Sequence, residues 1–137
     1  LIKYKNIYKN EVLLGYTEIK DKKDIININI PKVVFNDKKN LIYASRNQIP
    51  FFKSKNKNNS KCYRQVLAYC FPRNKILKFG RSKKKGVLEN SEDIEILRFL
   101  EMGIKVKMVK MSNKSISVDL YKDLKKVENI IKKNATR

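Results

Sequence analysis

The sequence predicts an α/β fold, in which helices pack against an open sheet. Short runs rich in β-branched and aromatic residues recur along the chain and are typical of strands. Two later stretches place apolar residues at three- and four-residue spacing, which is typical of amphipathic helices. The predicted order is strands, a hairpin, a strand, a helix, two strands and a helix, and this order favours a sheet layered with helices.

The first part of the chain predicts a strand and a hairpin. Residues 1–9 are weakly helical, 11–19 predict a strand, and 20–29 are polar and irregular. Residues 33–35 and 41–44 form the arms of a hairpin around an Asn- and Asp-rich turn. Such residues favour turns because their side chains bond nearby backbone groups and tolerate left-handed conformations.

The middle of the chain predicts a loop followed by a strand. Residues 53–61 are almost all Lys, Asn and Ser, and we expect a flexible, solvated loop there. Residues 63–71 have the composition of a buried strand, which Pro72 ends. A short helix over 74–79 and a basic loop over 80–86 follow.

The clearest helix is expected next, capped by Asn90 or Ser91 and ended by Gly103 in the left-handed conformation. A strand over 104–109 and a second short strand, which ends at Asp119, come after it. An amphipathic helix over 120–133 closes the chain. The sheet looks incomplete, because parallel strands need helices on both faces and too few are predicted.

The formal net charge is +20, from 33 Lys and Arg against 13 Asp and Glu. One interpretation is a basic RNA-binding module, whose binding would depend steeply on salt. The other is mutational drift in an AT-rich genome, because the charge is mostly Lys, is spread along the chain and accompanies abundant Asn and Ile. We favour drift and expect no specific nucleic-acid partner.

Several classes of site and location are disfavoured by composition. The chain has two Cys and no His, which rules out Ser-His or Cys-His catalysis within it and leaves too few ligands for a usual zinc site. The two thiols suggest a reduced, cytoplasmic protein. No apolar run approaches the roughly 20 residues of a membrane span, and no signal peptide is visible. Because the chain starts without Met, we read it as an excerpt or a truncated reading frame.

Five residues are candidates for binding chemistry. Asp119 follows a strand, where a carboxylate either binds Mg²⁺ or caps the next helix. Glu95 belongs to an acidic cluster that suits either the start of a helix or sugar hydroxyls. Arg46 suits a carboxylate or a phosphate, or is a surface residue. Gln65 and Tyr69 share one face of their strand, where core packing is the alternative for Tyr69. The four glycines form no phosphate-binding array.

Three segments, in order, resemble the sugar-activating cytidylyltransferases, most closely the 3-deoxy-manno-octulosonate cytidylyltransferases. They are PKVVFNDKKNLIYASRNQIP, YRQVLAYCFPRNKILKF and LENSEDIEILRFLEMGIKVKMVKMSNKSISVDLYKDL. The resemblance runs from about residue 31 to 132. It implies that 1–137 is the carboxy-terminal part of one nucleotide-diphospho-sugar transferase-like (Rossmann-like) domain, a mixed sheet with flanking helices whose amino-terminal nucleotide-binding half would lie upstream.

The resemblance implies an activity as well. The family transfers CMP from CTP to a 2-keto sugar acid, releasing pyrophosphate, as a cytoplasmic Mg²⁺-dependent homodimer that serves lipopolysaccharide synthesis. The resemblance implies that Asp119 is a Mg²⁺ ligand and that Tyr69 and Glu95 contact the sugar acid. It places Gln65 and Arg46 among the substrate-binding residues as well. We expect this part alone to be inactive, with no catalytic residue of its own, and the hairpin over 31–50 to be a dimer element.

Three departures from the family pattern bear on the substrate. Gln65 stands where better-known members have His, Ile96 where they have Gln, and Leu120-Tyr121 where they have Thr-Pro. The loss of a polar contact at Ile96 leaves the identity of the sugar open. A related enzyme that takes a sialic acid, an acylneuraminate cytidylyltransferase, is therefore an alternative.

Overall fold

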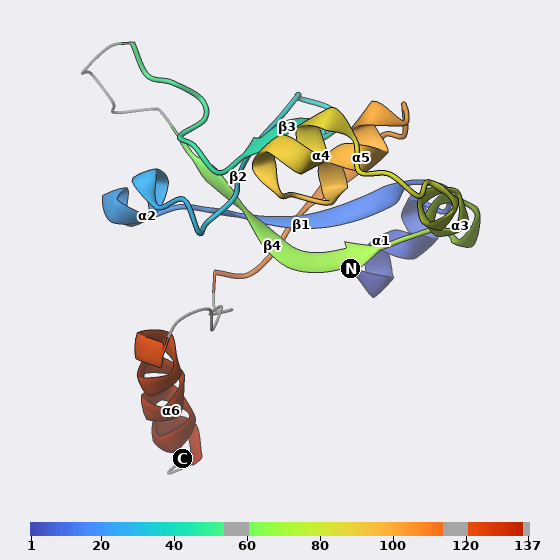
Figure 1. Cartoon of the computed structure of the whole chain (residues 1–137). Coiled ribbons are helices and arrows are strands. Elements are labelled where there is room, and N and C mark those ends of the chain that lie inside the picture. Colours follow the sequence, from blue (N-terminus) through green and yellow to red (C-terminus); the bar gives the residue numbers. More distant parts are fainter. Residues whose placement is uncertain (54–60, 114–120, 136–137) are drawn as a thin grey trace.

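The computed structural model describes residues 1–53, 61–113 and 121–135. Figure 1 shows a twisted sheet, with helices on one side of it and at its ends, and a separate carboxy-terminal helix. Within the described part of the chain the sheet has five strands in the order β3-β2-β4-β1-β5. The strands are β1 (Val12–Glu18), β2 (Lys32–Phe35), β3 (Leu41–Ser45), β4 (Tyr63–Cys70) and β5 (Val106–Lys110). The helices are α1 (Ile2–Ile7), α2 (Lys22–Ile26), α3 (Arg73–Arg81), α4 (Val87–Glu92), α5 (Ile96–Glu101) and α6 (Tyr121–Ala135).

Strand β1 lies inside the sheet and determines its mixed character. It pairs antiparallel with β4 on one side and parallel with β5 on the other. Leu13 and Leu14 point to opposite faces, yet both are fully buried, so the sheet is covered on both faces at this strand. A mixed sheet with flanking helices is what the sequence predicts, and the structure confirms it.

The predicted hairpin is present as β2 and β3. Its turn is held by the side chain of Asn36, whose Oδ1 accepts a hydrogen bond from the Asn40 N–H at 2.9 Å. Lys39 adopts a left-handed conformation with φ of 59°, and its carbonyl accepts a bond from the Met108 N–H at 2.7 Å. The turn is therefore fixed against β5, from the far end of the sequence.

The hydrophobic core lies between the sheet and α5. Alternate residues of the strands face it, and the apolar residues around and within α5 fill it from the other side. The core residues are Val12, Leu14, Tyr16, Val33, Leu41, Ala44, Ile94, Ile96, Leu97, Phe99, Ile104, Val106 and Met108. Ile96 is 1% exposed, so this departure from the family pattern packs into the core.

The prediction of one helix ending at Gly103 is wrong in its first half. The segment forms two short helices, α4 and α5, because Asp93 adopts a left-handed conformation with φ of 51° and ends α4. Asn90 and Ser91 lie inside α4 rather than at its N-cap, which is Gly86. The predicted end is confirmed, since Gly103 follows α5 with φ of 69°.

The prediction of an irregular segment over 20–29 is wrong for the residues that form α2. The first turn of α2 is capped by Asp21, whose side chain accepts a 2.9 Å bond from the Lys23 N–H. The helix predicted over 74–79 is α3 and runs two residues further. The predicted strand before Asp119 and nearly all of the 53–61 loop lie outside the described residues. No helix among the described residues is long and apolar enough to span a membrane.

Candidate functional site

The carboxylate of Glu92, at the end of α4, holds the end of the β2–β3 hairpin. Its oxygens accept hydrogen bonds from Ser45 Oγ at 2.7 Å, from the Arg46 N–H at 2.9 Å and from Tyr43 Oη at 3.3 Å. Burial acts to raise the pKa of Glu92, but these three donors outweigh burial and hold that pKa below its ordinary value. Glu92 is therefore charged near neutral pH and joins the hairpin to α4.

The guanidinium of Arg46 completes this junction from the other side. Its Nε donates to the Glu92 carbonyl at 2.7 Å and its Nη2 to the Asp93 carbonyl at 3.0 Å. Its Nη1 donates to the Ile28 carbonyl at 3.2 Å. The break between α4 and α5 frees carbonyls from the helical hydrogen-bond pattern, and Arg46 takes two of them. The left-handed turn at Asp93 is thus stabilised by a residue 47 positions earlier.

A fully buried lysine lies beneath the same junction. Lys32 is 0% exposed, and its ammonium donates to the Asn27 carbonyl at 2.9 Å and to the Arg46 carbonyl. Burial lowers the pKa of Lys32 from its ordinary value. The ammonium fixes the loop before β2 and the backbone of Arg46 in one place.

A buried ion pair connects α4 to α5. The carboxylate of Glu89 accepts hydrogen bonds from Nε and Nη2 of Arg98, and the side chain of Glu89 is 1% exposed. The bonds from Arg98 hold the pKa of Glu89 below its ordinary value. The guanidinium also lies over the ring of Phe79, 4.0 Å from its centroid, and so adds a cation–π contact from α3.

From this ion pair a row of stacked rings leads to β4. Phe79 stacks on Phe99 with centroids 4.7 Å apart, Phe99 on Phe71 at 5.2 Å, and Phe71 on Tyr69 at 5.5 Å. The planes of successive rings differ by 14° to 18°. The stack fixes the position of the Tyr69 ring relative to α5.

The side chains of Gln65 and Tyr69 meet on β4, as expected for a shared face, and the register of β4 against β1 shifts between them. Nε2 of Gln65 donates to the Tyr69 hydroxyl. Gln65 is 5% exposed, and its Oε1 is buried without a hydrogen-bond partner. A buried amide oxygen without a donor costs about 1–3 kcal/mol, so a hydroxyl that reached this oxygen would relieve that cost.

Glu95 belongs to the same group of residues. Burial raises the pKa of Tyr69, and the negative charge of Glu95 raises it further. Glu95 is exposed and stands immediately before α5, two residues beyond the Asp93 carbonyl that Arg46 binds. The structure thus brings Gln65, Tyr69 and Glu95 together. Arg46 contacts none of these three side chains and is held at the turn by the Asp93 carbonyl, two residues before Glu95.

This arrangement is chemically suited to a polyhydroxylated anion. It offers a carboxylate and an amide oxygen as acceptors and a phenol that both donates and accepts, and the positive charge of Arg46 lies at the turn before Glu95. The fifth candidate, Asp119, lies outside the described residues. Within those residues there is no cluster of three or more Cys, Asp or Glu side chains that would hold a metal ion.

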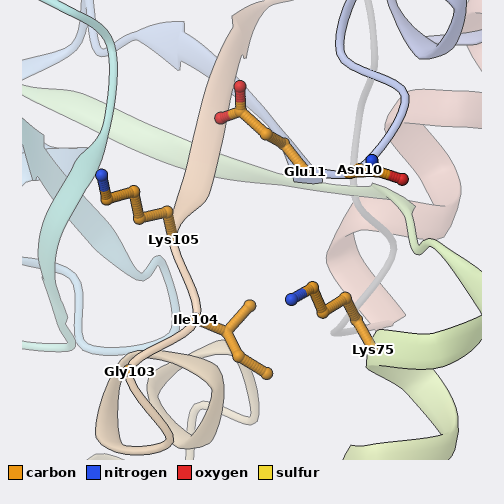
Figure 2. Close-up of a pocket in the computed structure, with 6 residues that line it drawn as sticks. All are labelled: Asn10, Glu11, Lys75, Gly103, Ile104 and Lys105. Carbon is orange, nitrogen blue, oxygen red and sulfur yellow. The ribbon is translucent and has the colours of Figure 1, made fainter.

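A shallow pocket of about 280 Å³ lies elsewhere, at the amino-terminal ends of β1 and β5. Figure 2 shows its lining residues, with the Glu11 carboxylate, Lys75 and Lys105 around the backbone at Gly103 and the side chain of Ile104. None of the predicted site residues lines it. In an open α/β sheet ligands collect at the carboxyl ends of strands, so this pocket is not the candidate site.

Sequence reasoning missed Glu92 and Lys32. Glu92 was one acid among four near the start of an expected helix, and Lys32 one lysine among many. A signal for Lys32 existed, because it stands directly before the apolar run Val33-Val34-Phe35 of a predicted strand. No local signal identifies Glu92, since its partners come from β3.

The chain is similar to curated proteins named 3-deoxy-manno-octulosonate cytidylyltransferase. That of Christiangramia forsetii is 35% identical over 115 residues, which are 84% of this chain and 46% of that protein. That of Solibacter usitatus is 31% identical over 128 residues, which are 92% of this chain and 50% of that protein. The chain therefore spans about half the length of the curated relatives it matches. No family model matches it.

A solved structure agrees with these relatives. The structure of CMP:2-keto-3-deoxy-manno-octonic acid synthetase complexed with CTP superposes with a TM-score of 0.82 at 21% identity. The match covers 97% of this chain and 54% of that one, which shows a common fold. Sequence and fold together confirm the predicted resemblance: the chain corresponds to the carboxy-terminal part of a 3-deoxy-manno-octulosonate cytidylyltransferase.

Proposed function

We propose that this chain takes part in the transfer of CMP from CTP to a 2-keto sugar acid, KDO or a close relative, giving the CMP-sugar and pyrophosphate. The observation that carries the proposal is the match, at 31–35% identity, to proteins named for this activity. In that reaction a sugar hydroxyl attacks the α-phosphate of CTP and pyrophosphate leaves. The product would serve lipopolysaccharide synthesis in the cytoplasm.

The geometry around β4 supports the sugar acid as the ligand of this part. The Glu95 carboxylate and the orphan oxygen of Gln65 accept hydrogen bonds from sugar hydroxyls, and the Tyr69 hydroxyl donates or accepts. A bound hydroxyl would supply the donor that Gln65 Oε1 lacks. These three residues would orient the sugar so that its attacking hydroxyl meets the nucleotide.

Arg46 contributes through position and charge. Its three bonds to carbonyls hold it at the turn before Glu95. From there its positive charge favours the carboxylate of the sugar acid, and the carbonyl contacts keep the turn in shape. We propose both roles for the one side chain.

The nucleotide would be held mainly by the part of the family to which this chain does not correspond. The four glycines form no phosphate-binding loop, so residues 1–137 alone should not turn over CTP. Asp119 would supply one carboxylate to Mg²⁺, which balances the charge on the phosphates. Homodimer formation through the hairpin over 31–50 also belongs to this proposal.

The test joins the amino-terminal half of the Solibacter usitatus enzyme to this chain before Leu1 and measures pyrophosphate release with CTP and Mg²⁺. We expect release with KDO from the joined protein and none from 1–137 alone. A panel with sialic acids distinguishes the alternative substrate. CMP-sugar formation by 1–137 alone, or a joined and folded protein inactive on every sugar acid, would contradict the proposal.

Two substitutions locate the sugar site in that joined protein. Tyr69→Phe and Glu95→Gln each remove one hydrogen-bonding group, and we expect KM for the sugar acid to rise about tenfold, equivalent to about 1.4 kcal/mol. KM for CTP should stay unchanged. Tyr4→Phe on α1 and Glu18→Gln at the end of β1 are matched controls, and equal effects of controls and site variants would remove these residues from the site.

A further inference from the structure

Strand β4 carries a bulge at the candidate site. Successive residues of β1, Leu14 and Gly15, pair with residues of β4 that are three positions apart, Tyr69 and Val66. The two residues between them are not paired with β1, and the first of these, Leu67, is 68% exposed. Figure 1 shows β4 curving on its way to α3. Bulges bend a strand and re-aim its side chains, and they are common next to active sites.

The bulge brings the side chains of Gln65 and Tyr69 together. Residues four positions apart on a regular strand are separated by about 13 Å, which side chains standing perpendicular to the sheet do not bridge. Here the partners of Gln65 and Tyr69 on β1 are Tyr16 and Leu14, which are only two positions apart. Nε2 of Gln65 accordingly donates a hydrogen bond to the Tyr69 hydroxyl. The bulge therefore determines the spacing of this pair.

Gly15 of β1 supplies the space beside the bulge. A Cβ atom at this position would lie 3.2 Å from Cβ of Val66, 3.4 Å from the Val66 carbonyl oxygen and 2.9 Å from Cγ of Met111. The two carbon–carbon distances are shorter than ordinary contacts, so Val66 or Met111 would have to move. Gly15 does not have a positive φ, so its role here is the close approach of β4 and not backbone freedom.

A displacement of Val66 would act on Gln65, the residue directly before it, more than on Tyr69. The ring of Tyr69 stacks on Phe71 with centroids 5.5 Å apart, and Phe71 stacks on Phe99 of α5 at 5.2 Å. This stack holds Tyr69 in place from the helix layer. A shift of Val66 would therefore change the distance between the Gln65 amide and the Tyr69 hydroxyl.

We propose that Gly15 is a positioning residue for the sugar acid. By leaving room for the bulge, it sets the separation of the Gln65 amide and the Tyr69 hydroxyl, the two groups that would meet the sugar hydroxyls. The inference rests on the proposed function, because that function makes these groups ligands of the sugar. Misplacing such groups by about 1 Å can cost about 100-fold in rate, so the space at Gly15 has a functional consequence.

The experiment introduces Gly15→Ala into the joined protein and measures KM for KDO and for CTP. We expect KM for KDO to rise about tenfold and KM for CTP to stay unchanged. A crystal structure of this variant should show the hydrogen bond between Gln65 and Tyr69 lengthened or lost. Gly80→Ala on α3 is the matched control, because a Cβ atom there meets nothing within 4 Å, and it should leave both KM values unchanged.

A second variant separates positioning from simple overpacking. Gly15→Ala combined with Met111→Ala removes the closest contact of the new Cβ atom and leaves its contacts with Val66. We expect KM for KDO to stay raised relative to Met111→Ala alone. A return to the value of Met111→Ala alone would show that Gly15→Ala acts only by crowding Met111, and would overturn the proposal. If Gly15→Ala by itself does not fold, this double variant carries the comparison.

The other outcomes distinguish this inference from the proposed function. If the joined wild type is active but Gly15→Ala leaves KM for KDO unchanged, or raises KM for KDO and CTP equally, the positioning role is overturned and the proposed function stands. An unchanged hydrogen bond between Gln65 and Tyr69 in the crystal structure of the variant would also overturn it. A folded wild type that is inactive on every sugar acid would contradict the proposed function, and this inference with it.

Discussion

The two sides of the α4–α5 turn differ in how completely their polar groups are satisfied. On the hairpin side, the oxygens of Glu92 accept three hydrogen bonds and the guanidinium of Arg46 donates three. On the β4 side, Gln65 keeps a buried oxygen without a donor. Buried polar groups are almost always paired in folded proteins, so the Glu92 and Arg46 side is satisfied within the described chain, whereas the β4 side leaves one acceptor unpaired.

The largest expected effect lies at the buried ion pair of Glu89 and Arg98, which connects α4 to α5. Glu89→Ala leaves the buried guanidinium without its carboxylate, and we expect the free energy of unfolding to fall by about 3–5 kcal/mol. Urea denaturation followed by circular dichroism measures the loss. Asp93→Asn is the control, because the Asp93 side chain is 71% exposed and Asn tolerates the left-handed conformation; it should cost less than about 0.5 kcal/mol.

The same pair predicts a pH dependence with a definite sign. Because Arg98 lowers the pKa of Glu89 in the folded state, the pair contributes its full stability above the ordinary Glu pKa of about 4.3. That contribution is lost as pH falls from there through the lower folded value. Glu89→Gln should flatten this part of the stability profile, and an unchanged slope between wild type and variant would show that Glu89 does not carry it.

A smaller effect is expected at Glu92. Glu92→Ala removes the acceptor of Ser45, Tyr43 and the Arg46 N–H, and unsatisfied donors cost about 1–3 kcal/mol in all. Glu92→Gln keeps one carbonyl oxygen and should recover part of this loss. Urea denaturation of both variants gives the comparison. Equal stability of wild type and Glu92→Ala would mean that the junction depends on Arg46 alone.

These contacts also show why the sequence predicts the strands better than the break between α4 and α5. The strands are recognisable from their own residues: β4 is apolar and aromatic, and the β2–β3 turn is rich in Asn and Asp. The break between α4 and α5 cannot be recognised from its own residues, because its left-handed residue, Asp93, is stabilised by the distant Arg46. Local spacing predicted one helix through that point, and a contact across 47 residues decided otherwise.

Only part of the candidate site could be predicted from the sequence. The two-residue period of a strand predicts a shared face for Gln65 and Tyr69, but four residues span about 13 Å on a regular strand. Their direct hydrogen bond accompanies a register shift of β4 against β1 between them, which the sequence does not predict. The proximity of Glu95 to Tyr69 depends on how α5 stacks through Phe99 and Phe71 onto β4, which no local pattern contains. The burial of Lys32 likewise depends on the two carbonyls that accept hydrogen bonds from its ammonium.

The smallest expected effect on stability is at Gln65, and it separates the two sides most sharply. Gln65 is as buried as many core residues, with 5% exposed. Gln65→Met removes an oxygen that has no partner, along with one hydrogen bond to Tyr69, and keeps a similar volume. Because the lost bond and the removed orphan oxygen offset each other, the free energy of unfolding should change by less than about 1 kcal/mol.

The same substitution should matter for a ligand. If the orphan oxygen of Gln65 accepts a sugar hydroxyl, Gln65→Met in the joined protein should raise KM for KDO about tenfold and leave KM for CTP unchanged. Glu92→Ala should show the opposite pattern in urea denaturation, with a clear loss of stability. A variant at Gln65 that loses as much stability as one at Glu92 would show that the orphan oxygen is satisfied within the fold, and the contrast between the two sides of the turn would then disappear.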